Sequence, residues 1–337
     1  MKKHIKNKLN ILILIVITLL VLYLSLKDDF YTTMHQILTM NIYWLMAGVL
    51  LVISYWYLRS IVFHQFVNKF HGNYRFLKAF KLVVTTQFFH AITPFASGGQ
   101  PYEIYALKKE GIKFTDVTNI SIQNFIVYQI ALVILGIIAI VSNYFFHIFK
   151  EVGIVKELVL VGFVVNLLVI IGLFVISFGR RINQFIVNRI ITFLEYIKII
   201  KDKEHILAKW EKYISEFHDG AKLLVENKKM FIGTIFINFV ALLCLYLVPL
   251  VILYSIGDYH SVDGLLSIIS CAYIMLIGSF VPIPGGTGGL EYGFIEFFGN
   301  FVGGSSLKAT MLIWRFLTYY FGMFAGAIAL NIKRKER

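Results

Sequence analysis

Long apolar runs alternate with short polar segments along most of the chain, and the lengths of these runs predict helices that cross a lipid bilayer. A transmembrane helix needs about 20 consecutive, mostly apolar residues. Uninterrupted runs near this length occur at six places, Leu9–Leu26, Tyr43–Phe63, Val117–Val141, Leu158–Phe178, Met230–Ile256 and Ala309–Leu330. The first run follows the basic stretch MKKHIKNK but is too long for a cleaved signal peptide, so we expect it to be retained as a span.

Two further apolar regions, Leu82–Leu107 and Leu265–Phe301, are each interrupted by a segment rich in proline and glycine. Proline ends a helix because it lacks the backbone N–H, and glycine permits turns with φ > 0. The pattern therefore predicts two half-helices in each region, which either cross the membrane or turn back within it. The predicted helix breakers are Pro94, Pro101, Pro282 and Pro284.

The distribution of basic residues decides between crossing and turning back. Cytoplasmic loops of membrane proteins carry an excess of Lys and Arg. If both regions turn back, 26 of the 32 Lys and Arg residues fall on one side, whereas a full crossing of either region would spread them over both faces. We therefore expect an all-α polytopic membrane protein with six full transmembrane spans, two inverted re-entrant helical hairpins and both termini in the cytoplasm.

The composition supports a single integral membrane domain over residues 1–337. Hydrophobic residues make up 58% of the chain and charged residues 15%, compared with about 45–50% and about 25% in soluble domains. The net charge of +13 follows from the one-sided placement of Lys and Arg, so nucleic acid is not expected as a partner. The one sizeable polar segment, 179–229, has apolar residues at helical spacing and predicts amphipathic helices at the cytoplasmic interface.

The two interrupted regions share the pattern P-x-x-[ST]-G-G. With one hairpin entering from the cytoplasm and the other from outside, this pattern indicates an inverted repeat, an arrangement common among secondary transporters. A chance match in a glycine-rich membrane protein is the alternative. The residues of the pattern are Pro94, Ser97, Gly98 and Gly99 in the first region and Pro284, Thr287, Gly288 and Gly289 in the second.

Each break places the start of a new half-helix at membrane depth, and these starts predict an anion site. Irregular backbone is tolerated there only inside the bundle or along a water-filled path. Ser97 or Thr287 can cap the half-helix that follows, and the positive ends of two helix dipoles aimed at one place suit a phosphate. The alternative is that the glycines only permit close packing of helices.

Ionisable residues within the apolar regions are candidates for the same site, because charges at membrane depth are costly and mostly functional. Glu103 and Glu291 follow the two breaks, where a carboxylate can instead serve as a partner of the helix dipole. Arg315 lies in the last span and can extend to the interface, pair with Glu291 or Glu296, or bind a lipid phosphate. Arg59 is expected to extend to the cytoplasmic interface.

Motifs for catalysis, nucleotide binding and metal coordination are missing from the sequence. H-E-x-x-H, G-x-S-x-G and paired C-x-x-C motifs are absent, and GGTGG lacks the G-K-[ST] of a P-loop. No catalytic residue, cofactor or metal is therefore expected.

The segments TPFASGGQPYEIYAL, PIPGGTGGLE and WRFLTYYFGMFAG resemble the lysylphosphatidylglycerol synthase transmembrane (flippase-like) family, which includes the N-terminal membrane half of the bacterial multiple peptide resistance factor. The resemblance covers essentially the whole chain and implies movement of a lipid, aminoacylated phosphatidylglycerol in the best-known member, between leaflets. The synthase domain is not expected here, because the sequence ends at NIKRKER after the last span. Gln100 and Pro101 stand where relatives often carry an acidic residue and proline, so this chain departs from the family pattern at Gln100, and Glu103 is a less secure equivalent of the acidic residue.

The sequence thus predicts a flippase or translocase of the bacterial cytoplasmic membrane that moves an anionic or aminoacylated phospholipid. A membrane transferase of the phosphatidylglycerol lysyltransferase family and a non-catalytic accessory of a lipid-modifying enzyme are the alternatives. A lipid-modifying enzyme and a second copy of the chain stay open as partners. The predicted headgroup and translocation residues are Arg315, Glu291, Glu103, Ser97, Gly98, Gly99, Thr287, Gly288 and Gly289.

Overall fold

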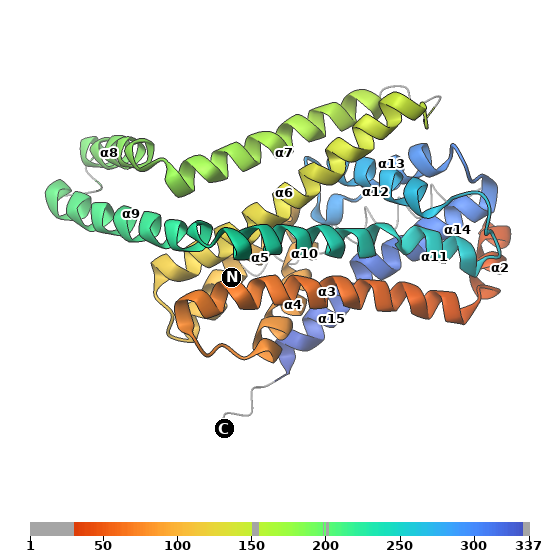
Figure 1. Ribbon diagram of the computed structural model, residues 1–337, viewed down its shortest axis with the longest axis horizontal. Coiled ribbons are helices and arrows are strands. Elements are labelled where there is room, and N and C mark those ends of the chain that lie inside the picture. Colours follow the sequence, from red (N-terminus) through yellow and green to blue (C-terminus); the bar gives the residue numbers. More distant parts are fainter. Residues whose placement is uncertain (1–29, 150–154, 198, 200–201, 333–337) are drawn as a thin grey trace.

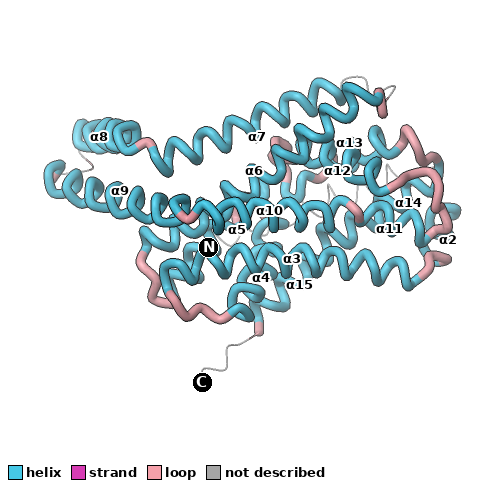
Figure 2. The backbone as a smooth tube through the Cα atoms, in the orientation of Figure 1, coloured by secondary structure: helices cyan, strands magenta, loops and turns pink. Residues whose placement is uncertain are grey.

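A computed structural model describes residues 30–149, 155–197, 199 and 202–332, and every regular element within these ranges is helical (Figure 2). Five helical stretches are long and apolar enough to cross a membrane by length and composition. They correspond to five of the six expected spans, and the remaining one, Leu9–Leu26, lies outside the described residues. The stretches are α3 (Ile42–His71), α6 (Phe114–Phe146), α7 (Val155–Phe178), α10 (Lys228–Tyr246) with α11 (Val248–Ser255), and α14 (Gly304–Arg315) with η3 (Phe316–Tyr320) and α15 (Phe321–Asn331).

Two of these stretches contain a local irregularity. The helix breaks between α10 and α11 at Leu247, because Pro249 in the first turn of α11 has no N–H to continue the hydrogen-bond ladder. In the last stretch, η3 is a π-helical turn in which the N–H of Phe321 bonds to the carbonyl of Phe316, five residues earlier. Turns of this kind are rare and often occur at functional sites.

Four shorter helices form the two interrupted regions. α4 (Phe76–Ile92) and α5 (Gly99–Lys109) pack against each other, and so do α12 (Gly264–Gly278) and α13 (Gly289–Phe298). At 1.5 Å per residue, α4 is about 25 Å long and α12 about 22 Å, and both are shorter than the hydrocarbon core of a bilayer, which is about 30 Å thick. Each region is therefore a pair of half-helices joined by a short turn, η1 (Pro94–Ala96) or η2 (Pro284–Gly286).

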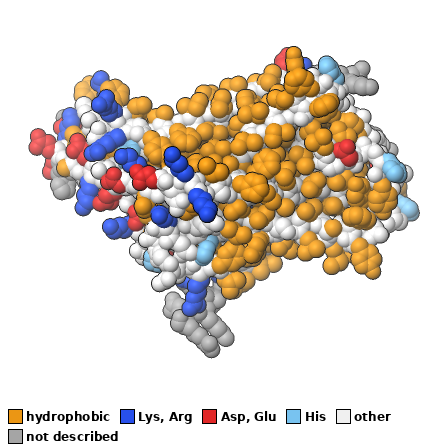
Figure 3. All heavy atoms as spheres, viewed as in Figure 1, with side chains coloured by type: hydrophobic (Ala, Val, Ile, Leu, Met, Phe, Trp, Pro, Cys, Tyr) orange, Lys and Arg blue, Asp and Glu red, His pale blue; other side chains and the backbone are white. Residues whose placement is uncertain are grey.

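The long helices run along the longest axis of the molecule, and the charged residues gather at one end (Figures 1 and 3). On the face shown in Figure 3, Lys and Arg cover the end formed by α8 (Arg180–Tyr196) and α9 (Lys203–Glu226), while apolar side chains cover the middle. The short helix α2 (Phe30–Leu38) lies at the opposite end. The segment predicted to be amphipathic is thus helical; α9 packs against α6, and Ile191 is the buried residue of α8.

The contact between α7 and α12 depends on a glycine. A Cβ at Gly162 would lie 2.1 Å from the backbone oxygen of Leu276, whereas a Cβ at Gly172, on the same helix, would meet nothing within 4 Å. A backbone carbonyl within a helix cannot move aside as a side chain can, so α7 approaches α12 this closely only with glycine at position 162.

Gly162→Ala is accordingly expected to destabilise the protein by about 1–3 kcal/mol, since α7 must shift away from α12. Gly172→Ala is the matched control, and it should be neutral or stabilising because alanine has the higher helix propensity. Thermal unfolding of the two variants in the same detergent measures the difference. Equal unfolding temperatures would show that the α7–α12 contact adapts to the added methyl group.

Candidate functional site

The two turns η1 and η2 have the same backbone course over their first three residues and then diverge, since Gly98 has φ of −78° and Gly288 has φ of 90°. In each, proline begins a three-residue helical turn, and the next half-helix begins five residues after that proline. The second and third residues are left-handed in both, with φ of 55° and 50° at Phe95 and Ala96 and of 67° and 63° at Gly285 and Gly286. Glycine adopts this conformation without strain, whereas the first turn imposes it on two residues with side chains. The shared geometry supports the internal repeat inferred from the sequence.

The serine and threonine of the repeat take part in equivalent hydrogen bonds. Ser97 Oγ donates to the carbonyl of Pro94 at 2.9 Å, and Thr287 Oγ1 donates to the carbonyl of Pro284 at 3.0 Å. Neither caps the following half-helix, so the predicted capping role is wrong. The hydroxyl of Thr93 accepts from the Gly98 N–H at 2.8 Å instead.

In the second turn, the acidic residue supplies the cap. Glu291 is the third residue of α13, and its Oε2 accepts from the Gly288 N–H at 2.7 Å. The expected role of this carboxylate at the helix terminus is thus present. Glu103 differs, because it is the fifth residue of α5 and lies beyond the first turn.

Two different structural requirements explain why the four positions of the pattern hold glycine. Gly288 has φ of 90°, which only glycine adopts readily. A Cβ at Gly98 would lie 2.7 Å from the Phe89 carbonyl, one at Gly99 would lie 2.1 Å from the His90 ring, and one at Gly289 would lie 2.5 Å from Val281. Close packing, one of the alternatives drawn from the sequence, therefore accounts for these three glycines.

The four predicted helix breakers also divide into two groups. Pro94 and Pro284 begin the helical turns, and Pro282 lies in the irregular segment before η2. Pro101 is the third residue of α5, where its missing N–H leaves no intrahelical bond unmade. The prediction that Pro101 breaks a helix is therefore wrong. Pro101 stands in the first turn of α5.

The two turns contact each other, and Tyr319 connects them. Its hydroxyl donates to the carbonyl of Ala91, near the end of α4, at 3.0 Å. Its ring covers Gly285, where a Cβ would lie 2.2 Å from the ring. Tyr319 was not identified from the sequence, although it stands four residues after Arg315 and so shares its side of the helix.

Arg315 and Glu291 form a buried ion pair beside the second turn. Arg315 Nε lies 2.6 Å from Glu291 Oε1, and the side chains are 6% and 10% exposed. Arg315 Nη2 donates to the carbonyl of Gly285 at 2.9 Å, and the guanidinium lies 4.7 Å from the centre of the Tyr319 ring. Within the described residues, Nε has no hydrogen-bond partner, so its contact with Glu291 is an ion pair without a hydrogen bond. Of the three alternatives for Arg315, extension to the interface is excluded, and pairing with Glu291 is observed.

Glu103 is buried at a separate place. It is 4% exposed, and its Oε2 accepts from Ser121 Oγ on α6 at 2.7 Å. In the part of the chain that the structure describes, Glu103 forms no ion pair and no contact with Glu291 or Arg315. The structure therefore brings two of the three predicted charged residues together and leaves the third apart.

Arg59 points inward, which corrects the expectation that it extends to the cytoplasmic interface. Its Nη1 donates to Asn238 Oδ1 at 2.6 Å, and its guanidinium lies 4.6 Å from the centre of the Tyr128 ring. An amide oxygen and a ring face within the bundle thus satisfy the charge that would otherwise need the headgroup region.

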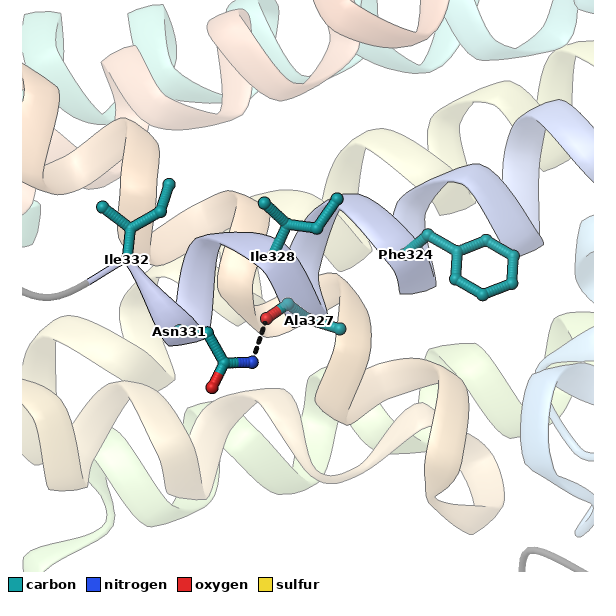
Figure 4. Close-up of a pocket in the computed structure, with 5 residues that line it drawn as sticks. All are labelled: Phe324, Ala327, Ile328, Asn331 and Ile332. Carbon is teal, nitrogen blue, oxygen red and sulfur yellow. Dashed lines mark hydrogen bonds between the residues drawn. The ribbon is translucent and has the colours of Figure 1, made fainter.

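A hollow of about 420 Å³ lies along the C-terminal part of α15, on the surface of the protein (Figure 4). It contains none of the predicted site residues, and the side-chain amide of its one polar member, Asn331, donates to the carbonyl of Ala327 at 2.9 Å. The polar cluster at the two turns is therefore the candidate site, and the hollow is a separate apolar feature. The lining residues are Phe324, Ala327, Ile328, Asn331 and Ile332.

Comparison with known proteins agrees with the resemblance inferred from the sequence. Residues 10–326 match the family described as the lysylphosphatidylglycerol synthase TM region. A "UPF0104 membrane protein" of Archaeoglobus fulgidus is 23% identical over 312 residues, which cover 85% of each chain. An "Uncharacterized protein MG306 homolog" of Mycoplasma pneumoniae is 22% identical over 337 residues, which cover 92% of this chain and 82% of the relative.

Proposed function

The chain belongs to the lysylphosphatidylglycerol synthase transmembrane-region family, and on this premise we propose that it is a flippase that moves a phosphate-bearing lipid, aminoacylated or not, between the leaflets of the bacterial cytoplasmic membrane. Membership supports a role connected with membrane lipids. The proposal goes further in naming the reaction, which is transport across the bilayer rather than chemical change of the lipid.

The observation that carries the proposal is the contact between the turns of two broken helices, next to a buried ion pair. Irregular backbone at membrane depth is tolerated where it is buried in protein or lines a water-filled cavity. The first turn is not buried, since the residues from Pro94 to Ser97 are exposed. A polar headgroup can therefore reach a pair of helix N-termini at a depth where lipid tails would otherwise surround it.

The site offers a phosphate both donors and a positive charge. The first N–H groups of a helix have no intrahelical partner, so the start of α13 adds its dipole to the positive charge of Arg315. Glu291 balances the charge of Arg315 while the site holds no anion. A phosphate that binds Arg315 competes with this carboxylate, and its arrival therefore loosens the contact between the last span and the second turn.

The proposed topology follows from the charges. The basic end of the molecule, over α8 and α9, faces the cytoplasm, and α2 faces outward. With the first apolar run as a sixth span, the pair α4–α5 enters from the cytoplasmic side and the pair α12–α13 from the outer side. This arrangement is the inverted repeat found in many transporters, where the substrate lies between the repeats near the bilayer midplane.

Reconstitution in liposomes tests the proposal. The probe is phosphatidylglycerol with a fluorophore on one acyl chain, and an impermeant reductant added outside quenches the outer leaflet. The protein is expected to move the probe so that the inner-leaflet fraction becomes quenchable. The double variant Arg315→Met with Glu291→Gln, which removes both charges together, is expected to slow this movement at least tenfold. Glu296→Gln, on the same helix, is the matched control and should move lipid at the original rate.

Two outcomes contradict different parts of the proposal. If the double variant moves lipid as fast as the unaltered protein, the site assignment is wrong. If neither this probe nor its lysylated counterpart moves, the protein is not a flippase for this lipid class, and the transferase or accessory role becomes the better account.

A further inference from the structure

The two acidic residues of the inverted repeat have different surroundings. Glu291 has a guanidinium at 2.6 Å and a backbone N–H at 2.7 Å. Glu103 is buried to a similar degree and has one hydroxyl, that of Ser121, at 2.7 Å. The repeat therefore holds one carboxylate whose charge is balanced and one whose charge is not.

An ionised carboxylate without a counter-ion is unstable in this position. Removing such a group from water costs several kcal/mol even after the protein relaxes, and a hydrogen bond to a charged group returns about 1.5–3 kcal/mol. A buried carboxyl group avoids the remaining cost by binding a proton. Glu103 is therefore neutral while it is enclosed by α4 and α6, and it ionises when water or a cation reaches it.

The positive groups around Glu103 are engaged elsewhere. Arg59 on α3 attracts the Glu103 charge through space but is held by Asn238 and the Tyr128 ring. On α4, Lys78 pairs with Glu110 at 2.9 Å and Lys81 donates to the Ile332 carbonyl at 2.8 Å. The other titratable groups on the packed helices are His90 on α4, Asp116, Tyr128 and Tyr144 on α6, and Tyr102, Tyr105, Lys108 and Lys109 on α5 itself.

Glu103 is one helical turn away from the exposed first turn. Gly99 and Glu103 are four residues apart and lie on one side of α5. Gly99 abuts the ring of His90, and that ring forms a hydrogen bond with the carbonyl of Ala96 in the exposed turn. A movement that opens this turn would therefore admit water to Glu103 first, and Glu291 would remain paired.

We propose that Glu103 binds one proton and releases it in each cycle of lipid movement, so that a proton gradient drives the transport. The proposal rests on the flippase function given above. The step is carboxylate plus proton to carboxylic acid, and no other bond forms or breaks. Glu291 differs, because Arg315 neutralises it while the site holds no anion.

The test uses the same liposomes with a pH gradient imposed across the membrane and a pH-sensitive dye inside. In the unaltered protein, the gradient is expected to change the rate of probe movement at least fivefold, and probe movement is expected to be accompanied by proton flux. Glu103→Gln keeps the acceptor for Ser121 but cannot ionise, so its rate should not respond to the gradient. Glu103→Asp should restore the response, and Glu296→Gln should retain it.

The outcomes separate the two proposals. Lipid movement that is insensitive to the gradient in the unaltered protein, or a Glu103→Gln variant that still responds, overturns the role of Glu103 and leaves the flippase function intact. Absence of lipid movement at every gradient overturns both. If Glu103→Gln fails to fold, proton flux measured with the dye in the unaltered protein tests the inference. Lipid movement without proton flux contradicts it.

Discussion

Arg315→Met alone is expected to destabilise the protein by about 3–5 kcal/mol, and most of this loss should return when Glu291→Gln is added. Removing one member of a buried ion pair leaves the other charge without compensation, whereas removing both is often close to neutral. The single change leaves the Glu291 carboxylate buried without its cation and the Gly285 carbonyl without its donor. In the double variant, the glutamine oxygen can still accept from the Gly288 N–H.

Thermal unfolding of the four proteins of this double-mutant cycle, in one detergent, measures the coupling between the two residues. A coupling close to zero would show that Arg315 and Glu291 contribute independently and that the ion pair does not hold the second turn. The cycle is a test of stability and does not depend on the transport assay, so it examines the geometry of the site separately from its proposed function.

Gly285→Ala is expected to destabilise the protein by roughly 2–4 kcal/mol and to separate the two turns. Position 285 has φ of 67°, which costs a residue with a Cβ about 1–2 kcal/mol. The new methyl group would also lie 2.2 Å from the Tyr319 ring. The ring must move away, and its hydrogen bond to the Ala91 carbonyl, which connects the second turn to the first, is then lost.

Gly286→Ala is the matched control for this prediction. Its φ of 63° is nearly the same, but the atom nearest to a new Cβ belongs to the flexible Leu290 side chain, at 3.0 Å. The control should therefore show the conformational cost alone, about 1–2 kcal/mol, when unfolding temperatures are compared. Equal effects at both positions would mean that Tyr319 does not couple the turns.

The features that the sequence predicted correctly depend on short stretches of chain. The length of an apolar run determines whether it can form a spanning helix, and this rule identified α6 and α7 to within about five residues at each end. It also identified the start of α3, but that helix continues to His71, beyond the predicted end at Phe63. The breaks after α4 and α12 were predicted because proline and glycine act on the backbone where they stand. The likeness of η1 and η2 was predictable because both turns begin at a proline and share the pattern P-x-x-[ST]-G-G.

The partners of the charged side chains could not be predicted in the same way. Arg59 forms a hydrogen bond with Asn238, which is 179 residues away along the chain. Glu103 on α5 forms one with Ser121 on the neighbouring helix α6. Such pairs depend on how the helices pack, and the local sequence is compatible with several partners. The predicted helix caps at Ser97 and Thr287 were wrong for a related reason. A hydroxyl beside a turn can either accept from a backbone N–H of the next helix or donate to a carbonyl of the turn. Ser97 and Thr287 both donate.

The π-helical turn after Arg315 holds one residue more than an α-helical turn, and it lies in the last span beside the two turns η1 and η2. An α-helix rotates by about 100° per residue, so relaxation of this turn to α geometry would twist one part of the span against the other by roughly that angle without breaking the helix. Arg315 lies just before the turn and Tyr319 lies within it. The π-helical turn therefore allows α14 to rotate relative to α15. Such a rotation would carry Arg315 away from Gly285 while α15 kept its contact with α4.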